Sequence, residues 1–100
     1  MNKEKLAELI EKNKNIELED DFAQNSIWNE MFEILSQNLN DTITFLDNIS
    51  ADELEYICSI FDDLSEHFKS QELIECMERN ALRTGVDCSI DIEYAKKALM

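Results

Sequence analysis

The chain of 100 residues contains no proline and a single glycine, Gly85. Hairpins and β-sandwiches depend on glycine, proline and Asn-Gly turns. A helix interior, by contrast, loses about 1 kcal/mol to each glycine and about 3 kcal/mol to each proline. The scarcity of both residues therefore predicts an all-α fold. It also argues against a glycine-rich phosphate loop, since Gly85 stands alone.

Lysine and arginine are absent between Lys14 and Lys69, although the same 54 positions contain fourteen acidic residues. We call this stretch, residues 15–68, the acidic block. The two flanks hold nine acids and all nine basic residues, so the formal net charge of −14 lies entirely in the block. Such a distribution repels nucleic acid and anionic lipid and accelerates encounter with a basic partner.

The three cysteines, Cys58, Cys76 and Cys88, include no CxxC pair. Charged residues interrupt the apolar pattern of the first ten positions, so we expect no secretory signal. No run approaches the roughly 20 apolar residues of a membrane span. These features predict free thiols, a cytoplasmic location and no membrane contact. We expect Cys58 and Cys76 in the core and Cys88 as an exposed loop thiol.

Apolar residues recur at helical spacing along most of the chain. Because 44% of the residues are apolar, one core is sufficient for independent folding. The pattern predicts a compact bundle of five to six short helices in one domain, residues 1–100. Helices are expected over residues 3–13, 16–25, 27–37, 40–48 and 51–68, between Ser70 and Gly85, and from about 90 to the C-terminus. Residues 27–48 form either one bent helix or two helices, and the cluster Asn38–Asp41 favours two.

Several residues are typical of helix ends. Ser26 and Ser70 are suited to N-caps, and Ser50 with Glu53 matches the capping box. Gly85 is placed to end a helix in the left-handed conformation. The core is expected to contain Trp28, Phe32, Leu35, Leu46, Leu54, Ile57, Phe61, Leu64, Phe68, Ile74 and Met77.

Groups that could perform chemistry are few. His67 is the only histidine and is expected to be a surface residue. Asp62, Asp63, Glu66 and His67 place ligand atoms within one and a half turns, but one helix supplies only one side of a coordination shell. We therefore expect no metal site, no cofactor and no enzymatic activity. Trp28 is interpreted as a core anchor rather than an interface residue.

The acidic block itself is the strongest functional feature. Acids on an exposed face are often merely solvated, but self-repulsion among fourteen of them destabilises the compact state, which favours a role in binding. On a continuous 51–68 helix these acids lie opposite or beside the apolar stripe. The expected partner-binding residues are Asp52, Glu55, Asp62, Asp63 and Glu66, helped by Glu19, Asp20 and Asp21.

Three segments resemble small helical immunity proteins of bacterial toxin–immunity pairs, including contact-dependent growth inhibition systems. They are Phe45–Leu54, Ile60–Glu75 and Asp91–Lys96, and the resemblance covers residues 26–99. It rests on packing and capping patterns, and it transfers no contact residue. It implies a cytoplasmic protein that binds the toxin domain of a delivered effector, often a nuclease, and blocks its active site. The partner is then a cognate toxin domain bound one to one, with no nucleic acid and no membrane.

Two other functions are compatible with the sequence. A nucleic-acid mimic would present carboxylates, spaced like phosphates along an elongated face, to a DNA-binding protein. A small helical adaptor would bind through an exposed apolar groove, and its affinity would depend only weakly on salt. A nuclease must present lysine and arginine to phosphates, so an inhibitor with carboxylates in matching places accounts best for the acidic block.

Overall fold

A computed structural model of the chain describes residues 1–15 and 21–99, and the side chains of residues 1–15 and 24–99. All regular structure in these residues is helical, which confirms the all-α bundle. Because α4, a 3₁₀ turn and α5 follow one another directly, the described chain contains six helical units. The elements are α1 (Lys3–Lys14), α2 (Asp21–Leu35), α3 (Leu39–Asn48), α4 (Ala51–Ile57), the 3₁₀ turn (Cys58–Ile60), α5 (Phe61–Phe68), α6 (Gln71–Thr84) and α7 (Ser89–Ala98).

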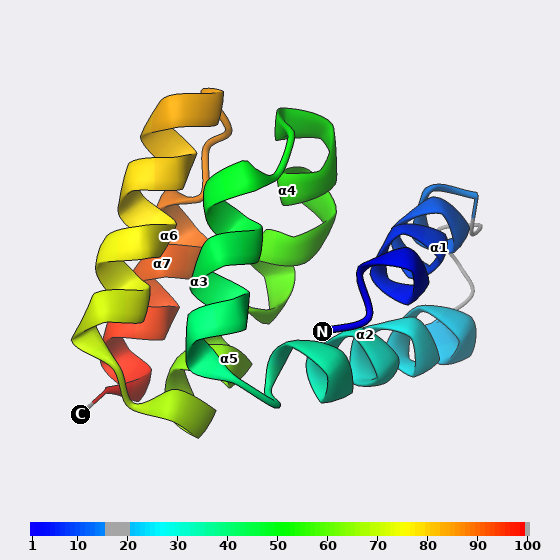
Figure 1. Cartoon of the computed structure of the whole chain (residues 1–100), viewed down its shortest axis with the longest axis horizontal. Helices are drawn as coiled ribbons and strands as arrows, with labels where there is room; N and C mark the ends of the chain where they lie inside the picture. Colours follow the sequence, from blue (N-terminus) through cyan, green and yellow to red (C-terminus); the bar gives the residue numbers. More distant parts are fainter. Residues whose placement is uncertain (16–20, 100) are drawn as a thin grey trace.

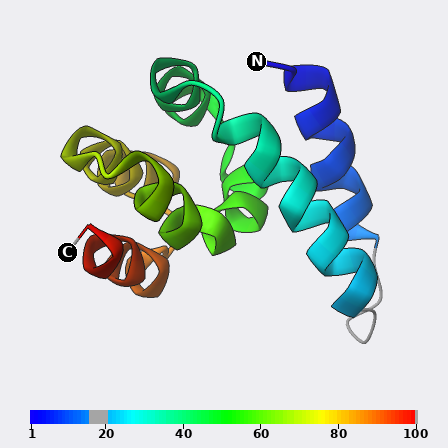
Figure 2. The ribbon, with the colours of Figure 1, turned by 90° about the horizontal axis from the view of Figure 1, so that it is seen from below.

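The helices form two groups with a connecting segment between them. Helices α3, α6 and α7 lie together in one group, and α1 lies beside α2 in the other (Figure 1, Figure 2). Helices α4 and α5 run between the groups. Helix α5 packs extensively on α7 and also contacts α2, whereas α4 contacts α1. The molecule measures 33 × 26 × 25 Å.

The predicted helix ends are confirmed at four positions. Asn38 accepts a hydrogen bond from the backbone N–H of Asp41, so residues 27–48 are divided between two helices, as favoured from the sequence. Ser50 and Glu53 form the reciprocal capping box, and Ser70 caps α6. Gly85 ends α6 at φ 77°, a left-handed conformation that glycine adopts without steric cost.

The predicted N-cap at Ser26 is wrong. Ser26 lies inside α2, which begins at Asp21 and ends at Leu35 rather than spanning 27–37. Serine costs only about 0.5 kcal/mol in a helix interior, and burial of Ile27 and Met31 on the same helix favours an uninterrupted helix. The short helix expected over 16–25 lies partly outside the described residues.

The continuous helix predicted over 51–68 is also wrong. It is interrupted by the 3₁₀ turn, and Ile60 has φ −106° and ψ 11°. Ile57, Cys58, Ile60 and Phe61 are all buried, although they span about 160° of a straight helix. An ordinary apolar stripe is narrower, on the order of 100°. The turn at Cys58–Ile60 allows all four side chains to enter the core.

Most of the predicted core is confirmed. Eight of its eleven residues are buried, whereas Trp28, Phe32 and Phe68 are only partly buried and pack at its margin. Cys58 and Cys76 are buried as expected. The prediction for Cys88 is wrong, since its side chain is 1% exposed at the start of α7. Two buried hydroxyls join helices, with Ser65 donating to the Ala95 carbonyl at 2.6 Å and Thr42 to the Leu35 carbonyl at 2.5 Å.

Candidate functional site

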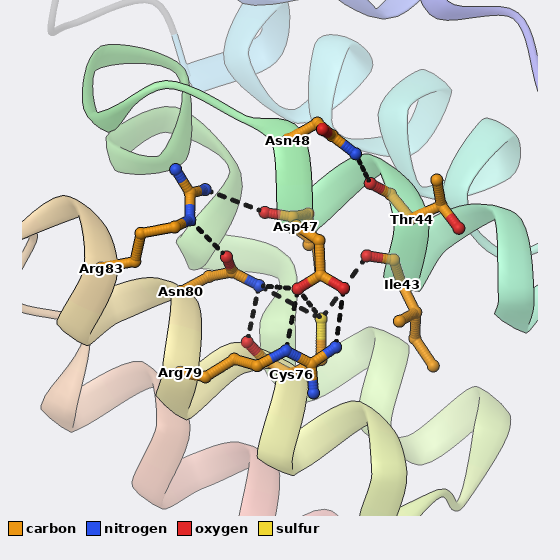
Figure 3. Close-up of polar contacts among 9 residues, drawn as sticks. Ile43, Thr44, Asp47, Asn48, Cys76, Arg79, Asn80 and Arg83 are labelled. Carbon is orange, nitrogen blue, oxygen red and sulfur yellow. Dashed lines mark hydrogen bonds and ion pairs between the residues drawn. The ribbon is translucent and has the colours of Figure 1, made fainter.

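Some acids of the block are neutralised within the protein, and Asp47 on α3 is the clearest example. Arg79 on α6 donates to its two carboxylate oxygens at 2.9 and 2.7 Å, and Asn80 donates at 2.7 Å (Figure 3). The hydrogen bonds from Arg79, assisted by Asn80 and opposed by partial burial, lower the pKa of Asp47 to about 2. Asp47 is therefore a structural acid that joins α3 to α6.

The same network continues along α6 to the end of α3. Arg83 donates through Nε to the Asn80 side-chain oxygen at 2.8 Å, and through Nη2 to the Ile49 carbonyl at 2.7 Å. The buried Asn80 amide also donates to the Cys76 carbonyl at 2.9 Å. Arg83 thus satisfies a carbonyl at the C-terminal end of α3, where positive charge is favourable.

Asp52, one of the predicted partner-binding residues, is also paired. Its carboxylate forms an ion pair with Lys14, so the start of α4 is joined to the end of α1. The Lys14 ammonium also lies 5.7 Å from the ring centre of Tyr56. Asp52 therefore presents less free negative charge than the sequence suggested.

The acids of α5 have a different environment. Asp62, Asp63 and Glu66 are exposed, and none forms an ion pair with a basic group among the described residues. Partial desolvation, followed by repulsion from Asp62 and Glu66, raises the pKa of Asp63. The three carboxylates thus form an uncompensated cluster, which is electrostatically unfavourable in the isolated protein.

Two of these acids line a groove of about 740 Å³ between α2 and α5, which we call the α2–α5 groove. Helix α5 contributes Asp63, Glu66 and His67. Helix α2 contributes Asn25, Trp28, Asn29 and Phe32. Neither wall carries a lysine or arginine. The structure therefore combines aromatic, amide and carboxylate side chains in one negatively charged hollow.

His67 fixes the two walls of the groove relative to each other. Its Nε2–H donates to the Ser36 carbonyl at 2.9 Å, directly after α2. The ring packs edge-on against Phe32 and Phe68, with centroid distances of 5.7 and 4.9 Å. His67 is thus an exposed residue, as predicted, with a positioning role in the groove.

Trp28 was expected in the core, but it forms part of the groove wall. Its indole Nε1 is buried and has no hydrogen-bond acceptor among the described residues. An unsatisfied buried donor costs about 1–3 kcal/mol. The sequence contains one signal for this wall. Asn25 and Asn29 lie three positions before Trp28 and one position after it, in a stretch without basic residues.

Of the other predicted acids whose side chains are described, Asp52, Glu55 and Asp62 are not among the residues that line this groove. Glu55 is exposed on α4, on the other side of the 3₁₀ turn. Three residues at about 120° each, instead of 100°, rotate the following helix face by about 60°. The α5 acids are therefore turned away from Glu55 by about 60° relative to their places on a continuous 51–68 helix. Glu19 and Asp20 lie outside the described residues, and Asp21 begins α2 but its side chain is not described.

A second groove, of about 660 Å³, lies between α6 and α7. Its apolar lining includes Ala81, Leu82, Val86 and Ile92, and the Leu82 side chain is 86% exposed. The charged residues at its rim include Glu78 and Lys96, which form an ion pair at 3.5 Å. Two further acids, Asp87 and Glu93, also line it, and Glu93 pairs with Lys97 at 3.9 Å. Two of the three acids of this mainly apolar groove therefore have basic partners, whereas neither acid of the α2–α5 groove has one among the described residues.

Other kinds of site were sought within the described part of the chain. There, no three His, Cys, Asp or Glu side chains are grouped so that they could hold a metal ion. None of the described helices has the length and apolarity needed to cross a bilayer. All three thiols are buried, and burial raises their pKa values, to about 11 for Cys76. A raised pKa reduces the thiolate fraction on which cysteine reactivity depends.

Comparison of the chain with protein-family models, curated protein sequences and solved structures found no match.

Proposed function

We propose that this protein is an inhibitor that binds one basic protein partner through the acidic surface of α5 and the adjoining α2–α5 groove. The observation that supports this most directly is the contrast between paired and unpaired acids. Asp47 and Asp52 have basic partners within the chain, whereas Asp62, Asp63 and Glu66 have none among the described residues. A partner that supplies positive charge would relieve their mutual repulsion.

The aromatic wall of the groove adds affinity to this charge. Interfaces are dominated by a few well-packed residues, among which tryptophan and arginine are enriched, while exposed rim charges contribute little individually. Trp28 is partly buried and lines the same groove as Asp63 and Glu66, which is a suitable place for such a residue. The surrounding acids then accelerate encounter, to roughly 10⁸–10⁹ M⁻¹s⁻¹ at low salt.

The biological role that best fits this surface is immunity against a protein toxin. We propose that the partner is the toxin domain of a delivered effector, bound one to one in the cytoplasm. A nuclease-type toxin must present lysine and arginine to phosphates, and its affinity for nucleic acid depends on them. Occupying these residues with carboxylates blocks the toxin without any turnover by the inhibitor.

The adaptor function is favoured by one observation, the apolar α6–α7 groove with its exposed Leu82. Mimicry of nucleic acid has less support, because the molecule measures 33 × 26 × 25 Å and is not the elongated shape that carboxylates spaced like phosphates would need. The three functions predict different responses to charge reversal and to salt, so one experiment separates them.

The experiment compares two triple charge reversals that change the net charge equally. The test variant carries Asp62→Lys, Asp63→Lys and Glu66→Lys. The control carries Glu75→Lys, Glu78→Lys and Glu93→Lys, at exposed positions of α6 and α7. Each is co-expressed with the candidate toxin, the C-terminal domain of the protein encoded directly upstream, and folding is checked by circular dichroism.

We expect the test variant to fold and to lose protection, whereas the control still protects. Wild-type association with the toxin should also slow markedly from low to physiological salt. Full protection by a folded test variant would exclude this face as the interface. Binding of unrelated DNA-binding proteins without a toxin would support mimicry. Loss of protection only in the control, together with salt-independent binding, would support the adaptor.

A further inference from the structure

The α2–α5 groove contains the two kinds of group that recognise a guanidinium. Asp63 and Glu66 supply carboxylate oxygens from α5, and Trp28 supplies a large aromatic surface from α2. The side-chain oxygens of Asn25 and Asn29 are further hydrogen-bond acceptors on the α2 wall. A planar cation that stacks on the indole and donates sideways to carboxylates would use both walls at once.

No basic side chain in the described part of the chain already fills that position. The lining residues include no lysine or arginine, and the Nε2–H of His67 is engaged by the Ser36 carbonyl. Partial desolvation, followed by repulsion from Asp62 and Glu66, raises the pKa of Asp63, and no basic side chain lines the groove to offset it. The α6–α7 groove differs, because Lys96 lies at its rim and pairs with Glu78.

We infer that the α2–α5 groove binds an arginine side chain of the partner protein, with the guanidinium stacked on Trp28 and hydrogen-bonded to Asp63 and Glu66. This inference rests on the proposed function and specifies its central contact. Arginine is preferred to lysine, because its planar fork donates to two carboxylate oxygens and stacks on aromatic faces, whereas an ammonium is a compact and strongly hydrated charge.

The inference is tested with short peptides, because Trp28 is the only tryptophan and its fluorescence reports on the groove without a label. The probe is acetyl-Gly-Arg-Gly-amide, titrated at low salt. The matched peptides replace arginine with citrulline, which has the same shape without the charge, or with lysine. The indole N–H signal in a ¹H–¹⁵N spectrum gives a second readout.

The arginine peptide should change the Trp28 fluorescence and shift the indole signal in a saturable way. The citrulline peptide should have no effect, and the lysine peptide should bind more weakly. Asp63→Asn with Glu66→Gln should weaken arginine binding by roughly tenfold or more. The control pair Glu75→Gln and Glu78→Gln, on exposed positions of α6, should leave it unchanged.

Equal binding of the arginine and citrulline peptides, or no response of Trp28 to any peptide, would overturn the inference. The inference would also be overturned if Glu75→Gln with Glu78→Gln weakened arginine binding as much as Asp63→Asn with Glu66→Gln. Such results leave the proposed function testable by the toxin experiment, since α5 acids can bind a basic surface without an arginine in the groove. Conversely, the arginine peptide could bind while the protein neither binds nor neutralises a toxin domain. That result would refute the proposed function and leave the inference about the groove intact.

Discussion

The α3–α6 contact and the α2–α5 groove both contain acids of the acidic block, but these acids have opposite environments. At the first, Asp47 receives hydrogen bonds from Arg79 and Asn80, and its pKa falls to about 2. At the second, partial desolvation and then repulsion from Asp62 and Glu66 raise the pKa of Asp63, which has no ion-pair partner in the described chain. The first arrangement favours the ionised carboxylate in the folded state, and the second disfavours it.

The difference separates acids that stabilise the fold from acids that oppose it. The bases that neutralise Asp47 and Asp52 come from the flanks, Arg79 from α6 and Lys14 from α1. No flank residue of the described chain reaches the α5 carboxylates in this way. Folding therefore leaves negative charge concentrated beside the groove, which is the property that the proposed function requires.

The largest loss of stability is expected from Phe61→Ala, which removes a core side chain from α5. Phe61 is fully buried at the start of α5, the helix that contacts both α2 and α7. Truncation should lower the free energy of unfolding by about 3–5 kcal/mol, measured by urea denaturation. Phe61→Leu, which retains more of the volume, should cost less. Equal and small losses for both variants would mean that α5 is not packed as described.

A smaller loss of stability is expected from Asn80→Ala at the α3–α6 contact. The buried amide joins Asp47, Arg83 and the Cys76 carbonyl, so its removal deletes three of the hydrogen bonds that hold this contact together. The free energy of unfolding should fall by about 1–3 kcal/mol. Leu82→Ala on the same helix should change it by no more than about 0.5 kcal/mol, because that side chain is 86% exposed. Equal effects of the two changes would contradict the structural role of the network.

The pH dependence of stability should reveal Asp47. Its pKa is lowered from 3.8 in the unfolded chain to about 2 in the folded protein, so its contribution is fully present above about pH 5 and is lost as the pH falls from about 4 to 2. Solvent screening of this partly exposed pair limits the contribution to about 1 kcal/mol. Asp47→Asn should reduce the loss of stability in that pH window. An unchanged pH profile would contradict the role of the Asp47–Arg79 pair.

Much of this fold was predictable because its local signals agree with its packing. Capping at Ser50, Ser70 and Gly85 depends on a few neighbouring residues, and all three helix ends are confirmed. The bend at Cys58–Ile60 was not predictable in the same way, because it depends on which neighbouring helices receive Ile57, Cys58, Ile60 and Phe61. Helical spacing alone made residues 51–68 appear continuous.

The candidate site was predictable from charge but not in its geometry. The absence of bases from residues 15–68 identifies the acids as a group. It does not reveal that Lys14 neutralises Asp52 or that Trp28 lies opposite Asp63, since both depend on contacts between distant parts of the chain. Trp28 resembled a core residue because its helical phase matches that of buried neighbours such as Met31 and Leu35.

The central claim is that the α5 acids serve binding at the expense of stability. It is tested most directly by urea unfolding of the Asp63→Asn, Glu66→Gln variant at neutral pH and low salt. Asp63 has a raised pKa in the folded state, so its ionised form opposes folding above that pKa. Glu66 lies in the last turn of α5, where negative charge is unfavourable.

We therefore predict that the double variant unfolds with a free energy equal to that of the wild type or higher by up to about 0.5 kcal/mol, while its association with the basic partner slows. A fall in the free energy of unfolding of more than about 1 kcal/mol would contradict the account, because it would identify Asp63 and Glu66 as structural acids like Asp47.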